Sequence, residues 1–263
     1  MGRVYTLVNQ KGGVGKTTTA INLGAYLALF GQRVLIVDID PQANATSSLG
    51  VDKQSVRGGI YEALLGGAPA AALVLQNPRL KLAILPSSPA LAGAEVELVN
   101  ELGRESRLRQ VIAPLVERYD YILIDCPPSL GLLTINGLMA AQDGVLIPVQ
   151  CEYLALEGLG DLTRTVQRVR SVLFPTLKVR GVILTMYDGR THLSEDVVSE
   201  VRKYFTKQVF ETIIPRSVRL AEAPSYGLPV SAYAPGSNAA KSYEALAREL
   251  LASDGVTVME SVD

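Results

Sequence analysis

A glycine-rich stretch near the start of the chain constrains the fold more than any other feature. Residues 11–18 read Lys-Gly-Gly-Val-Gly-Lys-Thr-Thr, and they stand between an apolar run, Val4–Val8, and a helix-like segment that begins near Lys16. A strand, a glycine turn and a helix N-terminus in that order direct backbone N–H groups and the positive end of the helix dipole at one spot, where oxygen atoms can approach closely. This order predicts a site that holds a polyphosphate.

Two side chains of this loop have direct roles in such a site. Lys16 is expected to reach the β- and γ-phosphates, and the Thr17 hydroxyl to ligate the Mg²⁺ that bridges them. The usual phosphate-loop pattern, G-x-x-x-x-G-K-[ST], is not met in full, because Gln10 stands where its first glycine would be and Lys11 opens the loop. A glycine turn that binds nothing is the alternative, but it does not account for the strand, the helix and the Lys-Thr pair together.

Apolar runs alternate with helix-like segments along the rest of the chain. The 263 residues and the 48% hydrophobic content fit one large α/β domain, whose central strands are covered on both faces. We therefore predict a doubly wound, mostly parallel sheet flanked by helices. The domain is expected to span residues 1–251, followed by a short, flexible acidic tail at 252–263. Further strands are expected at 33–42, 80–85, 121–125, 144–149 and 179–185, and the longer helices at 90–102, 108–118, 156–173, 194–205 and 239–251.

Acidic side chains close two of these strands. Alternate side chains of an extended chain share a face, so Asp38 and Asp40 are expected to point the same way, and both can face the phosphates. Parallel sheets bind ligands at the carboxyl ends of their strands, where these carboxylates stand. Asp125 follows four apolar residues, as a Walker B aspartate does, and is expected to support the metal. A candidate switch segment follows, with Thr134, Asn136 and Gly137.

Composition excludes several classes of protein. No apolar stretch reaches the ~18 residues that span a bilayer, and no secretory leader precedes the first strand, so we expect a cytoplasmic protein. Cys126 and Cys151 end apolar runs without metal-ligand spacing, which favours core packing, and His192 is expected on the surface. The net charge of −1 argues against a bulk nucleic-acid binder, yet residues 164–219 hold eleven Lys/Arg against five Asp/Glu, which allows a basic face.

The deviant loop with its extra lysine resembles the phosphate loop of the ParA/MinD family of ATPases. Within that family, roughly residues 3–250 are similar to the ParA/Soj chromosome- and plasmid-partitioning ATPases. With no additional N-terminal DNA-reading domain, the chain resembles the short, chromosomal-type members. One departure is Ala43, where glycine is frequent in the family, and no loss of activity is expected from it. Five separate stretches carry the resemblance, at 11–18, 38–46, 125–130, 148–153 and 214–225.

The resemblance implies an ATPase that uses ATP and Mg²⁺. Lys11 would reach across a nucleotide-sandwich dimer to the partner's phosphates and act there as an arginine finger does, so hydrolysis is expected to depend on dimerisation. Asp40 would orient or activate the attacking water. Thr17 would ligate the metal, with Asp125 in support. The nucleotide-binding residues that we expect are Lys11, Gly12, Gly13, Val14, Gly15, Lys16, Thr17, Thr18, Met186, Pro215 and Ser217.

The resemblance also implies contacts with adenine, DNA and a second protein. Residues 215–217 look like the family's adenine-contacting loop, with Met186 as a neighbour. Arg190 and Arg219 match positions of non-specific binding to double-stranded DNA, although each can equally be a solvated or locally paired side chain. A centromere-binding protein of the ParB/Spo0J type would stimulate slow hydrolysis, and the protein would be associated with the nucleoid.

Three other functions explain some of the same residues. A MinD-like membrane-associated cell-division ATPase needs a basic amphipathic C-terminal helix, but residues 252–263 are acidic and lack Lys and Arg. An iron–sulfur carrier like the nitrogenase iron protein needs cysteines in glycine-flanked loops, whereas Cys126 follows the Walker B aspartate. A binding module without turnover is excluded only by detecting ATP hydrolysis that Asp40→Ala abolishes.

Overall fold

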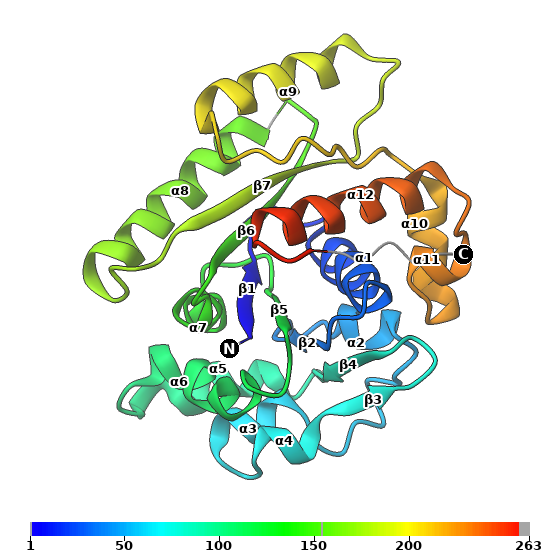
Figure 1. The fold of residues 1–263 in the computed structure, drawn as a ribbon. Coiled ribbons are helices and arrows are strands. Elements are labelled where there is room, and N and C mark those ends of the chain that lie inside the picture. Colours follow the sequence, from blue (N-terminus) through cyan, green and yellow to red (C-terminus); the bar gives the residue numbers. More distant parts are fainter. Residues whose placement is uncertain (1, 154, 258–263) are drawn as a thin grey trace.

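Seven strands form one sheet in the computed structural model, which describes residues 2–153 and 155–257 (Figure 1). In spatial order they are β3 (Leu75–Asn77), β4 (Leu82–Leu85), β2 (Val34–Asp38), β5 (Tyr121–Asp125), β1 (Arg3–Leu7), β6 (Gly144–Gln150) and β7 (Val179–Thr185). The edge strand β3 is antiparallel to β4, and the other neighbouring pairs are parallel. The doubly wound, mostly parallel sheet that the sequence predicts is therefore confirmed.

Alternate residues of the central strands face opposite sides of the sheet and enter different core clusters. In β1, Tyr5 and Leu7 pack with α1 (Lys16–Leu29) and α12 (Asn238–Ser253), while Val4 faces the other side. Figure 1 shows α12 (red) lying alongside α1 (blue) on the first face. Burial on both faces explains why these strands read as continuous apolar runs.

Helices from the middle of the chain cover the second face. Two core clusters lie there, one around β2 and β5 and one around β6 and β7. The covering helices are α3 (Ile60–Leu65), α5 (Leu91–Glu97), α6 (Arg107–Ile112), α7 (Leu132–Ala140), α8 (Ala155–Val172) and α9 (His192–Phe205). Shorter helices are α2 (Asn44–Ser48), α4 (Ala70–Leu73), α10 (Val218–Glu222) and α11 (Val230–Tyr233).

Two helices are shorter than the sequence predicts. The helix expected at 90–102 ends at Glu97 and continues as a 3-10 turn. The helix expected at 108–118 ends at Ile112, and Pro114 falls in the 3-10 turn that follows. Proline lacks the N–H that an α-helix needs at this point, so the regular bonding stops there.

Strand β3 and helix α7 were not foreseen from the sequence, and helix α9 begins two residues earlier than expected. Strand β3 has only three residues, two of them exposed, so it lacks the apolar run that marks the other strands. Helix α9 starts at His192, because Thr191 before it accepts a hydrogen bond from the Ser194 N–H (3.4 Å) as N-cap. The candidate switch residues lie buried within α7: Thr134, Asn136 and Gly137.

The C-terminal helix continues past the expected domain boundary at residue 251. Helix α12 extends beyond it, and the Asp254 carboxylate that follows is only 2% exposed. This carboxylate accepts hydrogen bonds from the hydroxyls of Tyr5 (2.7 Å) and Tyr121 (3.0 Å), in β1 and β5. The start of the expected tail is therefore tied to the sheet, while residues 258–263 lie outside the described residues.

Candidate functional site

The phosphate loop joins β1 to α1 and is anchored on both sides. The Asn9 side chain accepts a hydrogen bond from the Lys11 N–H (3.0 Å) and donates one to the Pro148 carbonyl (2.8 Å) in β6. The Thr185 hydroxyl, at the end of β7, donates to the Val14 carbonyl (2.8 Å). Because the Val14 side chain is buried, this residue fixes the loop to the sheet.

Two positions of the loop require glycine. Gly13 and Gly15 have φ angles of 74° and 93°, in the left-handed region that residues with a Cβ avoid. Gly15 is also the N-cap of α1, and no side chain within the described residues caps this helix end. The first N–H groups of α1 are therefore available to an anion, and the helix dipole adds to the attraction.

A pocket of about 360 Å³ opens over this loop. Lys16 lines it but is largely buried, and its Nζ donates to the Lys11 carbonyl (3.3 Å). Burial lowers the pKa of Lys16, and the nearby Asp125 carboxylate opposes that shift. The lining residues are Gly12, Gly13, Gly15, Lys16, Thr17, Thr18, Asp40, Asn44, Ser48, Pro128, Met186 and Pro224.

Thr17 and Asp125, the two residues expected at the metal, are in direct contact. The Thr17 hydroxyl donates to Asp125 Oδ2 at 2.6 Å, and Asp125 Oδ1 has no hydrogen-bond partner in the described part of the chain. Burial and then the facing Asp38 raise the pKa of Asp125. A hydroxyl beside a buried, unpartnered carboxylate oxygen fits Mg²⁺, which combines a few protein oxygens with phosphate oxygens and water.

The two carboxylates at the end of β2, Asp38 and Asp40, have different surroundings. Asp40 lies beyond the last residue of the strand and lines the pocket. Asp38 is completely buried and accepts hydrogen bonds from the Thr46 N–H (2.8 Å) and hydroxyl (2.7 Å). Burial raises the pKa of Asp38 to about 6. The expectation that both face the phosphates is therefore wrong for Asp38, because the strand ends there and the two-residue period no longer applies.

A second pocket, of about 270 Å³, adjoins the first. Met186, Pro215 and Ser217, expected at the adenine, line it together with Gly15 and Thr18 of the phosphate loop. Its mostly apolar walls suit an aromatic base. The sequence did not identify the residues that α10 and α12 contribute, because these helices reach the cavity only through the tertiary fold. They are Leu220, Ala221 and Tyr243.

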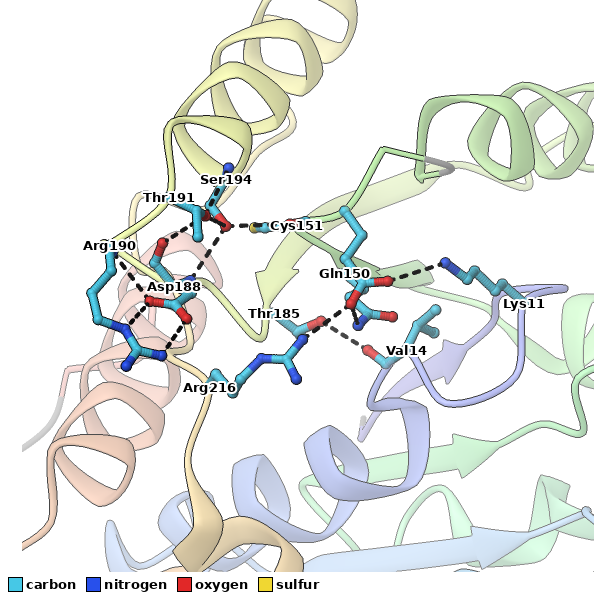
Figure 2. A network of polar contacts seen from close by, with 11 residues as sticks. Lys11, Val14, Gln150, Cys151, Thr185, Asp188, Arg190, Thr191, Ser194 and Arg216 are labelled. Carbon is cyan, nitrogen blue, oxygen red and sulfur yellow. Dashed lines mark hydrogen bonds and ion pairs between the residues drawn. The ribbon is translucent and has the colours of Figure 1, made fainter.

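Lys11 stands apart from the described residues that line the two pockets. Its ammonium group lies 3.7 Å from the Glu152 carboxylate, which also accepts a hydrogen bond from the Arg216 guanidinium (3.0 Å). Figure 2 shows Lys11 and Arg216 reaching from two different loops toward the end of β6, near Gln150. Within the single chain the Lys11 side chain is therefore held at Glu152, in an ion pair that the sequence did not predict.

Arg190 and Arg219 both lie on the surface, each beside a carboxylate. Arg190 precedes α9, its side chain is 87% exposed, and it makes two bonds to Asp188 (2.8 and 2.6 Å). The Arg190 guanidinium keeps the pKa of Asp188 well below its usual range. Arg219, in α10, is 56% exposed and bonds to Glu222 (2.8 Å). Exposed ion pairs of this kind contribute little to stability, so either arginine can exchange its carboxylate for a phosphate.

The two cysteines and the histidine lie where the sequence predicts. Cys126 and Cys151 are both buried, as predicted, and burial raises the pKa of Cys126 and brings that of Cys151 to about 12. His192 has an exposed side chain, also as predicted. Within residues 2–153 and 155–257, no helix combines the length and the apolar composition that a membrane crossing requires.

A glycine loop between a parallel strand and a helix, at the carboxyl edge of a doubly wound sheet, defines the fold and site of a P-loop nucleoside triphosphatase. A family model described as an AAA domain matches residues 2–179. The chain is 55% identical to the chromosome partitioning protein ParA of Myxococcus xanthus, over 97% of this chain and 89% of the relative. It is 52% identical to the sporulation initiation inhibitor protein Soj of Bacillus subtilis, over 96% and 100%. The chain belongs to the ParA/Soj family of chromosome-partitioning ATPases, which confirms the resemblance seen in the sequence.

A solved structure from Mycobacterium smegmatis has the same fold. It is described as cobyrinic acid a,c-diamide synthase with bound ADP and magnesium. It matches with a TM-score of 0.86 and 38% sequence identity over 100% of both chains.

Proposed function

We propose that this protein dimerises on ATP, binds DNA without sequence preference in that state, and leaves the DNA after partner-stimulated hydrolysis. The observation that carries the proposal is the different setting of two lysines in one loop. Lys16 lines the chain's own phosphate pocket, while Lys11 lies outside it and is about one-third exposed. A cation so close to the loop, yet outside its pocket, is suited to the phosphates of a second copy.

Four residues at the pocket have defined tasks in this proposal. Lys16 and the N-terminus of α1 bind the phosphates, and Thr17 and Asp125 would hold Mg²⁺, which would neutralise phosphate charge. Asp40 orients the attacking water from the pocket wall. Because phosphoryl transfer depends on positioning and charge neutralisation, hydrolysis stays slow until a second copy supplies Lys11.

Dimerisation on these terms breaks an ion pair within each chain. Lys11 has to leave Glu152 to reach the phosphates of a second copy. Glu152 is not left unpaired, because Arg216 remains bonded to the same carboxylate at 3.0 Å. The exchange therefore costs little free energy, and the triphosphate is a stronger partner for Lys11 than a half-exposed carboxylate is.

DNA binding follows from the surface arginines. A dimer doubles each basic position, and Arg190 and Arg219 would contact phosphates without reading bases. The resulting protein would be cytoplasmic and nucleoid-associated, and a ParB/Spo0J-like protein would trigger its release. The ParA relative reported above, at 55% identity, is named as a chromosome partitioning protein, which favours DNA segregation over a MinD-like role at the membrane.

The test combines hydrolysis with binding to duplexes of unrelated sequence. Wild-type protein should bind all duplexes alike with ATP, and not with ADP. Arg219→Glu should weaken binding to every duplex alike and reduce the salt dependence by about one phosphate contact per subunit, with ATP affinity unchanged.

Arg248→Glu is the matched control for this test. Arg248 is also exposed and bonded to a carboxylate, that of Glu244 (2.9 Å), so the variant carries the same change of charge at another surface. It should bind DNA as the wild type does. Sequence-selective loss in Arg219→Glu, or an equal loss in both variants, would contradict the proposed DNA surface.

A further inference from the structure

Asp40 lies in a turn beyond the end of β2, where pairing with the neighbouring strands no longer fixes the backbone. Strand β2 ends at Asp38, and the paired residues of its neighbours extend no further. The turn closes through the Ala43 N–H, which donates to the Asp40 carbonyl (2.8 Å). Ala43 has a φ of 52°, a left-handed conformation that a residue with a Cβ adopts only under constraint. The turn therefore needs support from outside its own backbone.

Two buried side chains form hydrogen bonds with the main chain of Asp40, one with its N–H and one with its carbonyl. Asp38 Oδ1 accepts a hydrogen bond from the Asp40 N–H (3.1 Å), and the Ser87 hydroxyl donates to the Asp40 carbonyl (2.8 Å). Ser87 follows β4, the strand beside β2, and is 1% exposed. Each of the two peptide units that flank Asp40 is therefore held by a side chain. One side chain is at the end of β2 and the other follows β4.

Thr46 connects Asp38 with Ser87 and so closes a ring of hydrogen bonds. Its N–H and hydroxyl both donate to Asp38 Oδ2 (2.8 and 2.7 Å), and its Oγ1 accepts from the Ser87 N–H (2.9 Å). The side chains of the ring are buried, so water does not replace a bond that is lost. A change at Thr46 therefore reaches Asp40 through both neighbours.

We propose that Asp38, Thr46 and Ser87 form a positioning network that holds the Asp40 carboxylate at the pocket in the orientation hydrolysis needs. The inference rests on the proposed role of Asp40 and extends it to side chains that do not line the phosphate pocket. A misplacement of about 1 Å in such a group can cost roughly 100-fold in rate. Nucleotide binding should depend on these residues far less, because none of them contacts the phosphate loop's pocket.

The test compares Thr46→Val with Thr46→Ser in the full-length protein. Valine keeps the shape but removes the hydroxyl, so Asp38 loses a donor and the Ser87 N–H loses its acceptor; serine keeps both bonds. Thr46→Val should lower kcat roughly tenfold while the affinity for a non-hydrolysable ATP analogue changes less than about twofold. Thr46→Ser should retain most of the wild-type kcat.

Thr6→Val is the matched control. Thr6 is likewise completely buried, and its hydroxyl donates to a backbone carbonyl, that of Gly137 (2.7 Å). This variant should lose thermal stability as Thr46→Val does and keep the wild-type kcat. An unchanged kcat in Thr46→Val, or an equal loss of kcat in Thr6→Val, would overturn the positioning network. Should Thr46→Val fail to fold, Ser87→Ala makes the same comparison, since it removes one bond to the Asp40 carbonyl.

Asp40→Ala, measured in parallel, separates this inference from the function on which it rests. If Asp40→Ala keeps its turnover, the proposed role of Asp40 is wrong. If Asp40→Ala loses turnover and Thr46→Val does not, the role of Asp40 stands and the positioning network is wrong.

Discussion

Replacing Asp125 with asparagine should stabilise the nucleotide-free protein and abolish its response to Mg²⁺-nucleotide. Among the described residues, the buried Asp125 carboxylate is bonded only through Oδ2, to Thr17, and Asp125 faces Asp38 across two paired strands. Burial and the neighbouring carboxylate both disfavour its charged form. Asparagine has the same shape without the charge, and its oxygen can still accept the bond from Thr17. On the proposed role of Asp125 at the metal, its carboxylate serves binding at the expense of stability.

The size of the effect follows from the charge that asparagine removes. An unpartnered buried neutral group costs about 1–3 kcal/mol and a charged one costs more, so removing the charge should stabilise the protein by roughly 1–3 kcal/mol. For a chain of this length 1 kcal/mol shifts the Tm by about 2–4 °C, so the Tm of Asp125→Asn should rise by roughly 2–12 °C. Raised carboxyl pKa values also mean that the folded state binds protons that the unfolded state releases. Wild-type stability should thus increase as pH falls through about 6, the pKa of the buried Asp38, toward the ordinary Asp pKa of about 3.9, and that of Asp125→Asn should increase less.

Thermal unfolding followed by circular dichroism, with and without Mg²⁺ and ADP, measures both effects. The variant should melt at a higher temperature than the wild type without ligand, and addition of Mg²⁺-ADP should raise only the wild-type Tm. Asp120→Asn is the control, because Asp120 is a surface carboxylate bonded to Arg33 and its loss should not stabilise the protein. A lower Tm for ligand-free Asp125→Asn would show that the Asp125 carboxylate does not destabilise the ligand-free protein.

Three further predictions concern the loop, its neighbour and the thiols. Lys16→Ala should weaken binding of a fluorescent ATP analogue by roughly 100-fold, and an unchanged affinity would mean that the loop is assigned wrongly. Glu152→Gln should free Lys11 and lower the ATP concentration for half-maximal dimerisation a few-fold, as removal of a half-exposed ion pair does; a higher concentration would mean that Glu152 contacts the second copy. Cys126 and Cys151 should resist iodoacetamide in the folded protein, because burial raises the pKa of both thiols, and mass spectrometry should find labelling only after denaturation. Rapid labelling of either thiol in the folded protein would contradict this.

The sequence predicts an element well where the physical signal is local. The glycines of the phosphate loop need their backbone angles whatever lies around them, and the apolar runs of the central strands are long enough to identify. The edge strand β3 has no such run. Asp40 was recognised by its motif, but Ser87 reaches it only because β4 pairs with β2. The ion pair of Lys11 with Glu152 likewise depends on tertiary folding, which brings the end of β6 beside the loop.

The most direct test of dimerisation through Lys11 is sedimentation velocity of wild-type protein and Lys11→Ala with ATP analogue, with ADP and without nucleotide. The wild type should sediment as a dimer only with the triphosphate, and Lys11→Ala should stay monomeric while still binding it. Dimers of Lys11→Ala as stable as those of the wild type, or a wild-type dimer that ignores the nucleotide, would contradict the claim that a triphosphate joins two copies through this lysine.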